Sequence, residues 1–204
     1  MKLYLAPGGC SLAVHIALAE FGYAPECETV DLKTGKTETG ADFHAIAGAD
    51  RTSALVLDDG TVLTECLAIL TWIAERYSSD STEPLARFRR LEMLSHIQSQ
   101  IRGLFDQVFD PSLAAEHRQR AAGRIAERLA HLGDRLKTPW LLGDRWTVAD
   151  AYLFVMLSWA ARKRIAIPMT LRGYYQRSAS LPGAMLALGR EGLLAPAAAS
   201  GEES

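Results

Sequence analysis

The chain has 204 residues, of which 49% are hydrophobic and 23% are charged, and its formal net charge is −2. This length and composition fit a soluble globular protein with one large domain or two small ones. The near-neutral charge provides none of the basic excess that nucleic-acid binding requires, so we expect no nucleic-acid partner.

Neither a membrane span nor a secretion signal is expected. The longest apolar stretch, residues 151–161, is shorter than the ~20 apolar residues that cross a bilayer. The first residues run directly into Pro7-Gly8-Gly9, so no signal-peptide core forms. The three cysteines, Cys10, Cys27 and Cys66, have no paired spacing. We therefore expect a cytoplasmic protein with reduced thiols and no membrane partner.

The first 77 residues alternate between strand and helix patterns. We predict strands at residues 2–6, 28–32, 54–57 and 61–63, and helices at residues 11–21, 41–46 and 65–77. The Asp58-Asp59-Gly60 turn joins the last two strands into a hairpin. The predicted order of elements is βαβαββα.

Beyond this unit the pattern becomes purely helical. Residues 78–85 are predicted to be a linker, because small and acidic residues lead to Pro84. Apolar residues then recur at helical spacing as far as Pro111, and a further apolar stripe follows at residues 125–136. We therefore predict an all-helical domain at 86–195 and a disordered tail at 196–204.

A helix-capping motif lies in the segment 141–153. Thr147 is predicted to cap a helix by accepting a hydrogen bond from the amide of Asp150, whose carboxylate reaches back to the amide of Thr147. The helix that follows is apolar on nearly all sides and should lie at the centre of the helical domain. We assign Thr147 and Asp150 a structural role.

Cys10 is the main candidate for chemistry. It follows a strand-like run and two glycines, and it begins the first predicted helix. Unpaired amides and the positive end of the helix dipole favour a thiolate at this position, and the thiolate is the reactive form of cysteine. Position 13 is Ala13, which argues against a C-x-x-C disulfide exchanger. A buried structural cysteine is the alternative interpretation.

Three segments together resemble cytosolic glutathione transferases, and more narrowly the bacterial beta class: residues 4–12, residues 57–65 and the Gly-Asp-x-x-Thr-x-Ala-Asp motif that begins at Gly143. The resemblance covers about residues 1–195. It implies a fold of the α/β plus all-α kind, with a thioredoxin-like glutathione-binding domain at 1–77 and a helical domain at 86–195. It also implies a homodimer that acts on small apolar electrophiles in detoxification.

The resemblance also implies roles for individual residues. Cys10 takes the place of a cysteine that forms a mixed disulfide with glutathione, and the Ser11 hydroxyl could stabilise a glutathione thiolate. The residues expected to bind glutathione are Lys36, Thr52, Ser53, Glu65, Cys66, Ser95, Ser99 and Arg102. The residues expected to line an electrophile pocket are Phe105, Phe109 and Trp159. Glutathione is the expected ligand or substrate, and no histidines pair at a metal-ligand spacing.

The chain departs from the family pattern in three places. A Val-Pro pair with a cis peptide is replaced by Thr52-Ser53, where we expect a trans bond because a non-proline cis bond costs ~3–4 kcal/mol. The turn before it is replaced by residues 47–50. A His-Lys pair is replaced by Arg102-Gly103, and arginine cannot act as a base at neutral pH. Two hypotheses therefore stand: a glutathione transferase, or a non-catalytic binding or regulatory protein with weakened glutathione binding.

Overall fold

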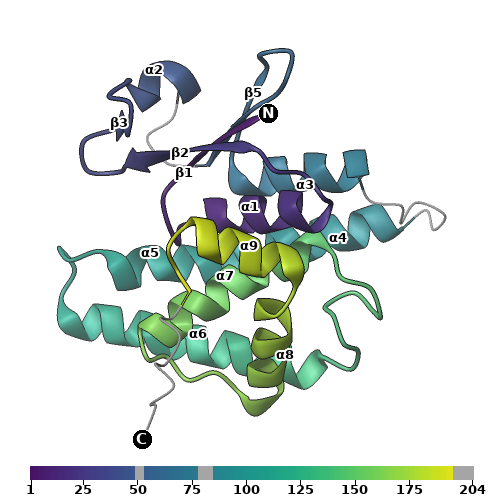
Figure 1. The fold of residues 1–204 in the computed structure, drawn as a ribbon. Helices are drawn as coiled ribbons and strands as arrows, with labels where there is room; N and C mark the ends of the chain where they lie inside the picture. Colours follow the sequence, from purple (N-terminus) through teal and green to yellow (C-terminus); the bar gives the residue numbers. More distant parts are fainter. Residues whose placement is uncertain (49–52, 78–84, 195–204) are drawn as a thin grey trace, which may run out of the picture.

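The N-terminal part of the chain is built on one five-stranded sheet. A computed structural model describes residues 1–48, 53–77 and 85–194 (Figure 1). The strands are β1 (Lys2–Leu5), β2 (Glu26–Asp31), β3 (Lys36–Thr37), β4 (Ala54–Val56) and β5 (Val62–Thr64). Their order in the sheet is β3-β2-β1-β4-β5, with β1 and β2 parallel and the other pairs antiparallel. The predicted strands are confirmed, and the two-residue β3 is an addition.

Helices occupy the rest of the described chain. They are α1 (Ser11–Glu20), α2 (Phe43–Ala47), α3 (Cys66–Tyr77), α4 (Ala86–Ile97), the π-helical turn η1 (Gln98–Arg102), α5 (Gly103–Phe109), α6 (Ala115–Arg135), α7 (Val148–Arg162), α8 (Met169–Ala179) and α9 (Pro182–Arg190). None of the described helices is long and apolar enough to cross a membrane.

The two faces of the sheet are covered by different helices. Leu3 and Leu5 of β1 are buried in the main core together with α1 and α3. Tyr4 points to the opposite face, as the alternation of a strand requires. There it packs against Phe43 of α2 with 5.8 Å between the ring centroids. The sheet is therefore a layer between α2 on one side and α1 and α3 on the other.

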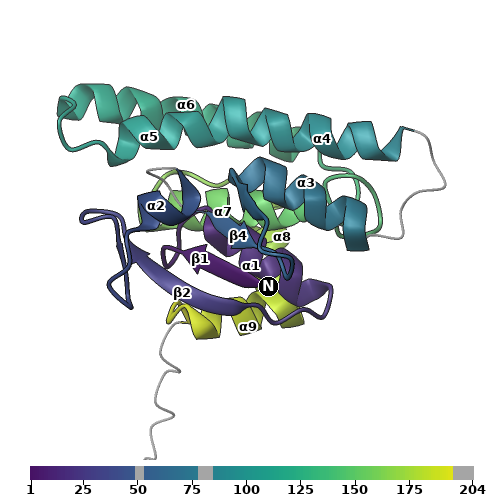
Figure 2. The same ribbon diagram turned by 90° about the horizontal axis from the view of Figure 1, so that it is seen from above.

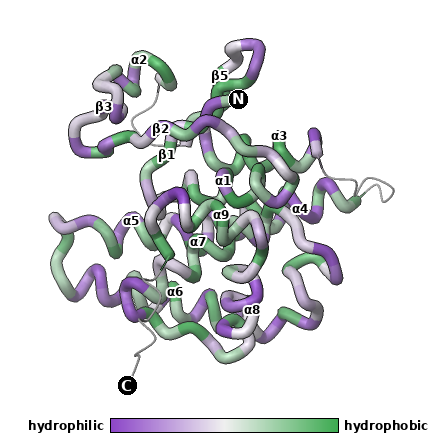
Figure 3. The backbone as a smooth tube through the Cα atoms, in the orientation of Figure 1, coloured by the Kyte–Doolittle hydropathy of each residue, from purple (hydrophilic) through white to green (hydrophobic). Residues whose placement is uncertain are grey.

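The helical region packs onto this unit through α1. Helices α7 and α9 both contact α1, and α7 also contacts α3 and α4. Figure 2 shows α4 and α5 running in one line, with α6 alongside them. The alternating colours of α6 in Figure 3 reflect its amphipathic pattern, in which Ile125 and Leu129 are fully buried. Helix α7 is buried along most of its length, as predicted.

The predicted capping box is present at the start of α7. The Asp150 carboxylate accepts a hydrogen bond from the Thr147 amide at 2.7 Å and another from the Thr147 hydroxyl at 3.0 Å. Its second oxygen accepts from the amide of Leu141 at 2.9 Å and from the hydroxyl of Tyr174 at 2.7 Å. The fully buried carboxylate thus ties α8 and the preceding loop to α7, beyond its predicted role as a cap.

Two expectations about the helical region are changed or fall outside the described residues. The apolar stripe up to Pro111 suggests one helix, but the structure divides it into α4 and α5 with the π-helical turn η1 between them. Of the linker predicted at 78–85, the structure describes Leu85, and the tail predicted at 196–204 lies outside the described residues. The division into domains at that linker stays a prediction.

Candidate functional site

A tight turn at the end of β1 positions Cys10. The amide of Gly9 donates a hydrogen bond to the carbonyl oxygen of Ala6 at 2.8 Å. A Cβ atom at Gly9 would lie 2.9 Å from that same oxygen, so the turn requires glycine there. Gly8 has a φ of 68°, which also favours glycine. Cys10 is the N-cap residue of α1, as its sequence position predicts.

A pocket of about 40 Å³ opens beside Cys10. Its walls come from the start of α1, the residue before β4, the junction of β5 with α3, η1 and α7. The lining residues are Cys10, Ser53, Glu65, Cys66, Gln98, Arg102 and Tyr152. A water molecule takes about 30 Å³ in the liquid, so the pocket has room for a group the size of a thiol. Both halves of the fold are needed to enclose it.

The electrostatics of Cys10 correct one prediction. Burial raises the pKa of the Cys10 thiol, and hydrogen bonds from Arg102 and Tyr152 offset this only in part. The expectation that the helix start favours a thiolate at Cys10 is therefore not met, because the loss of solvation outweighs the favourable donors. Burial also raises the pKa of Tyr152, so this hydroxyl stays protonated and remains a donor.

The opposite wall of the pocket combines backbone strain with an unpaired polar atom. Glu65 joins β5 to α3 with a φ of 66°, which is uncommon for a residue other than glycine and is a feature of functional sites. The buried Ser53 hydroxyl has no hydrogen-bond partner among the described residues. The thiol of Cys66 donates to the carbonyl oxygen of Cys10 at 3.4 Å, and burial raises its pKa. An unpaired buried hydroxyl at a pocket wall suits a polar ligand.

The structure brings together five of the residues predicted to act on glutathione: Cys10, Ser53, Glu65, Cys66 and Arg102. Three others do not line this pocket: Lys36 is exposed on β3, Ser95 is exposed on α4 and Ser99 is exposed on η1. Thr52 lies outside the described residues, and so does the expected trans bond between Thr52 and Ser53.

Sequence reasoning missed Gln98 and Tyr152. Gln98 lies four residues before Arg102 within η1, and both side chains reach the pocket. The hydroxyl of Tyr152 hydrogen-bonds the side-chain oxygen of Gln98. The sequence feature that could have identified Tyr152 is its hydroxyl group, which is a polar group in the otherwise apolar helix α7. A π-helical turn is common at functional sites, but the hydrophobic pattern of residues 91–108 does not indicate one.

Ser11 does not join the pocket. Its side chain is fully buried, and its hydroxyl accepts a hydrogen bond from the amide of Ala6 at 3.1 Å and donates to the carbonyl oxygen of Ala6 at 3.3 Å. The hydroxyl therefore closes the turn before α1. This geometry does not support the predicted role of Ser11 at a glutathione sulfur.

The three predicted electrophile-pocket residues form one aromatic cluster. The ring centroid of Trp159 lies 5.3 Å from that of Phe105 and 5.1 Å from that of Phe109. Phe105 is fully buried and Trp159 is nearly so, whereas Phe109 is 40% exposed. Phe109 is therefore the member of this cluster that presents most surface to a ligand, and Phe105 packs behind it.

A mixed sheet flanked by helices, followed by a helical region that completes a thiol pocket, defines a thioredoxin-like domain joined to an all-helical one. Comparisons with known proteins agree. Residues 115–177 match the family model described as "Glutathione S-transferase, C-terminal domain". The chain is 35% identical to glutathione S-transferase GstA of Escherichia coli O157:H7, over 95% of this chain and all of that protein.

Solved structures give the same result. A sphingomonad glutathione S-transferase complexed with glutathione and the beta-class enzyme of Sphingomonas chungbukensis both have a TM-score of 0.87 and 38% identity. Each comparison covers 95% of this chain and all of the other. The chain belongs to the glutathione S-transferase family, and its relatives include beta-class bacterial members. Among the described residues, no group of three or more His, Cys, Asp or Glu side chains could hold a metal ion.

Proposed function

We propose that this protein binds glutathione with its sulfur beside Cys10 and acts as a glutathione transferase on small apolar electrophiles, or as a thiol–disulfide exchanger through Cys10. The observation that carries the proposal is the pocket itself. It gathers a thiol, the proton donors Arg102 and Tyr152, the Glu65 carboxylate and the unpaired Ser53 hydroxyl. The sphingomonad relative, whose structure holds glutathione, supports the choice of ligand.

The pocket has room for the sulfur of glutathione, and the polar side chains that line it suit the parts of the molecule that extend beyond it. The Glu65 carboxylate can accept from the ammonium of the γ-glutamyl end, and a charge-assisted hydrogen bond of this kind is stronger than a neutral one. The Ser53 hydroxyl is available to a polar group of the backbone of glutathione. Arg102 and Tyr152 donate toward sulfur, so they favour a thiolate over a thiol once glutathione is bound.

Two reactions are compatible with this arrangement. In conjugation, the glutathione thiolate attacks an electrophilic carbon, forms a sulfur–carbon bond and releases the leaving group with its electron pair. In exchange, the Cys10 thiolate attacks one sulfur of a glutathione disulfide, forms a mixed disulfide and releases the other half as a thiolate. The exposed Phe109 ring, with Trp159 behind it, provides an apolar surface for an electrophile.

A non-catalytic binding protein is the competing proposal, and one observation favours it. Burial raises the pKa of Cys10, which favours the less reactive thiol over the thiolate. Under this alternative the fold retains a ligand pocket without turnover.

Calorimetric titration with glutathione tests binding first. We expect a dissociation constant between micromolar and low millimolar, weakened in Glu65→Gln and unchanged in the matched surface variant Glu38→Gln. The absence of heat at about ten millimolar glutathione, a ceiling for weak binding on the affinity scale, would exclude the transferase. Binding without turnover of any aromatic electrophile would favour the binding protein.

Mass spectrometry after treatment with oxidised glutathione tests the role of Cys10. We expect an adduct of one glutathione at Cys10 and none at Cys27. The variant Cys10→Ser should carry no adduct. An equal or greater yield at Cys27 would remove Cys10 from this role.

We also propose a cytoplasmic homodimer that contributes to detoxification. The three cysteines are free, which fits a reducing compartment. Phe88 and Leu91 of α4 are 59% and 37% exposed, and exposed apolar side chains on one helix are typical of an interface. Light scattering should give twice the chain mass for the wild type and a smaller mass for Phe88→Asp. A wild-type monomer would contradict the dimer.

A further inference from the structure

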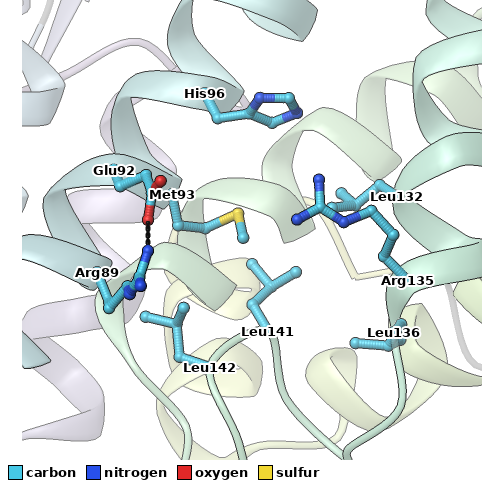
Figure 4. Close-up of a pocket in the computed structure, with 9 residues that line it drawn as sticks. All are labelled: Arg89, Glu92, Met93, His96, Leu132, Arg135, Leu136, Leu141 and Leu142. Atoms are coloured by element: carbon cyan, nitrogen blue, oxygen red, sulfur yellow. Dashed lines mark hydrogen bonds and ion pairs between the residues drawn. The ribbon is translucent and has the colours of Figure 1, made fainter.

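A second cavity lies in the helical region, between α4 and the C-terminal end of α6. Its volume is about 220 Å³, and the segment 136–142 closes one side of it. Figure 4 shows five apolar side chains directed toward its interior: Met93, Leu132, Leu136, Leu141 and Leu142. It shares no lining residue with the Cys10 pocket.

The polar side chains around this cavity are two arginines, one histidine and one glutamate. Arg89 and His96 extend from α4, and Arg135 extends from the end of α6 (Figure 4). The acidic member of the lining, Glu92, pairs with Arg89 at 2.8 Å, so its charge is offset. No carboxylate among the described residues forms an ion pair with Arg135. The lining therefore carries an excess of positive charge.

The pKa of His96 is lowered, so this side chain adds no positive charge of its own near neutral pH. Burial lowers its pKa, and the nearby charges of Arg135 and Arg128 lower it further. A protonated histidine is disfavoured where positive charge is already concentrated. The cavity thus combines an apolar interior with a positive potential at its rim, which is the complement of an anion with an apolar body.

We propose that this cavity is a second binding site, for a small organic anion with a ring-sized apolar body and a carboxylate or sulfonate group. The five apolar side chains would surround the body. The Arg135 guanidinium would bind the anionic group, for which its paired N–H donors are suited. An apolar cavity of about 150 Å³ accepts benzene, so a volume of about 220 Å³ suits a body of one or two rings.

Calorimetric titration with 1-naphthoate tests the proposal, with the neutral alcohol 1-naphthalenemethanol as the matched ligand. We expect one 1-naphthoate per chain. The variant Arg135→Gln should bind it about fivefold more weakly, because the rim arginine is exposed and its charge is partly screened. Affinity for the neutral alcohol should not change. The control variant Arg124→Gln, exposed on the same helix but outside the cavity, should bind as the wild type does.

A cavity-filling variant and an aromatic-cluster variant complete the test. Leu142→Trp should abolish binding while its melting curve shows a folded protein. If Phe109→Ala weakens binding and Arg135→Gln leaves it unchanged, the probe occupies the aromatic cluster and the proposal is wrong. Absence of binding to the wild type at millimolar 1-naphthoate would also overturn it. Binding should persist in Cys10→Ser and in the presence of glutathione, so the result is independent of the function proposed for the Cys10 pocket.

Discussion

The indole N–H of Trp159 donates a hydrogen bond to the carbonyl oxygen of Gly8 at 2.7 Å, and these two residues are 151 positions apart in the chain. Arg162 donates to the same oxygen at 3.0 Å. Glu191 accepts from the amide of Gly8 at 2.9 Å. Three side chains from the helical region therefore hold the peptide groups that lie two residues before Cys10.

Replacing Trp159 by phenylalanine should loosen this arrangement without emptying the aromatic cluster. The ring remains, but the carbonyl of Gly8 loses its buried donor. We expect Trp159→Phe to lower the free energy of unfolding by about 1–2 kcal/mol, the usual effect of breaking one buried hydrogen bond. Urea denaturation measures this. The half-buried Trp72 on α3 provides the control. If Trp72→Phe lowers the free energy of unfolding by the same amount, the hydrogen bond to Gly8 does not account for the effect of Trp159→Phe.

The contact between His15 and Glu191 should make stability depend on pH. His15 is fully buried in α1, with its Nδ1 atom 2.9 Å from Glu191 and its Nε2 atom 3.8 Å from the sulfur of Cys27. Burial alone lowers the pKa of His15, but hydrogen bonds to Cys27 and Glu191 outweigh it and raise the pKa to about 9. The folded protein therefore holds a proton that the unfolded chain releases near pH 6.5.

The stabilisation from this proton is complete below about pH 6.5 and is lost as the pH rises through about 9. Its size is at most about 3 kcal/mol, from the shift in pKa. Urea denaturation at pH 6 and pH 9 should show this decrease in the wild type. Glu191→Gln keeps an acceptor for Gly8 but removes the charge, so its decrease should be smaller. Glu127→Gln, exposed on α6, should behave as the wild type does, and parallel curves for all three proteins would contradict the assignment.

Most of the fold could be predicted because it depends on local patterns. Strand alternation, the Asp59-Gly60 turn and the apolar stripes of α3, α6 and α7 all follow from residues close in sequence. The strand β3 could not be found this way, since its two residues have no period of their own. The π-helical turn η1 was also missed, because one widened turn leaves the apolar stripe almost unchanged.

The site could be predicted only in part, because its chemistry depends on contacts distant in sequence. The position of Cys10 at a helix start is local, and it was predicted correctly. The pKa of its thiol depends on how deeply α7 and η1 bury it, which no local pattern reveals. The inward turn of Ser11 likewise depends on the backbone of Ala6.

The buried Asp150 carboxylate should be among the most sensitive positions in the chain. It accepts hydrogen bonds from Thr147, Leu141 and Tyr174. An asparagine has the same shape, but its amide N–H groups would face donors. We expect Asp150→Asn to lower the free energy of unfolding by about 2–4 kcal/mol, since it unpairs more than one buried group. Asp144→Asn, exposed in the same segment, should change urea stability by less than about 0.5 kcal/mol. A similar effect of the two variants would mean that the network contributes little.

The pH dependence of Cys10 alkylation should report on Arg102. The guanidinium of Arg102 hydrogen-bonds the Cys10 thiol and lowers the pKa of Cys10, but burial raises this pKa by more. Arg102→Gln should therefore raise the pKa of Cys10. The rate of reaction with iodoacetamide near pH 8 should then fall about three- to tenfold, because one pKa unit changes the thiolate fraction by about tenfold. Stopped samples analysed by mass spectrometry give the rate at Cys10 separately from Cys27.

Asp106 provides the matched variant with the opposite sign. It forms an ion pair with Arg102, and its negative charge raises the pKa of Cys10. Asp106→Asn removes that charge and leaves Arg102 in place, so alkylation of Cys10 should become faster at the same pH. Tyr152→Phe should slow the reaction, because it removes the second donor to the sulfur. If Arg102→Gln and Asp106→Asn shift the alkylation profile in the same direction, the change reflects altered access to the pocket, and charge at Arg102 does not control the thiol.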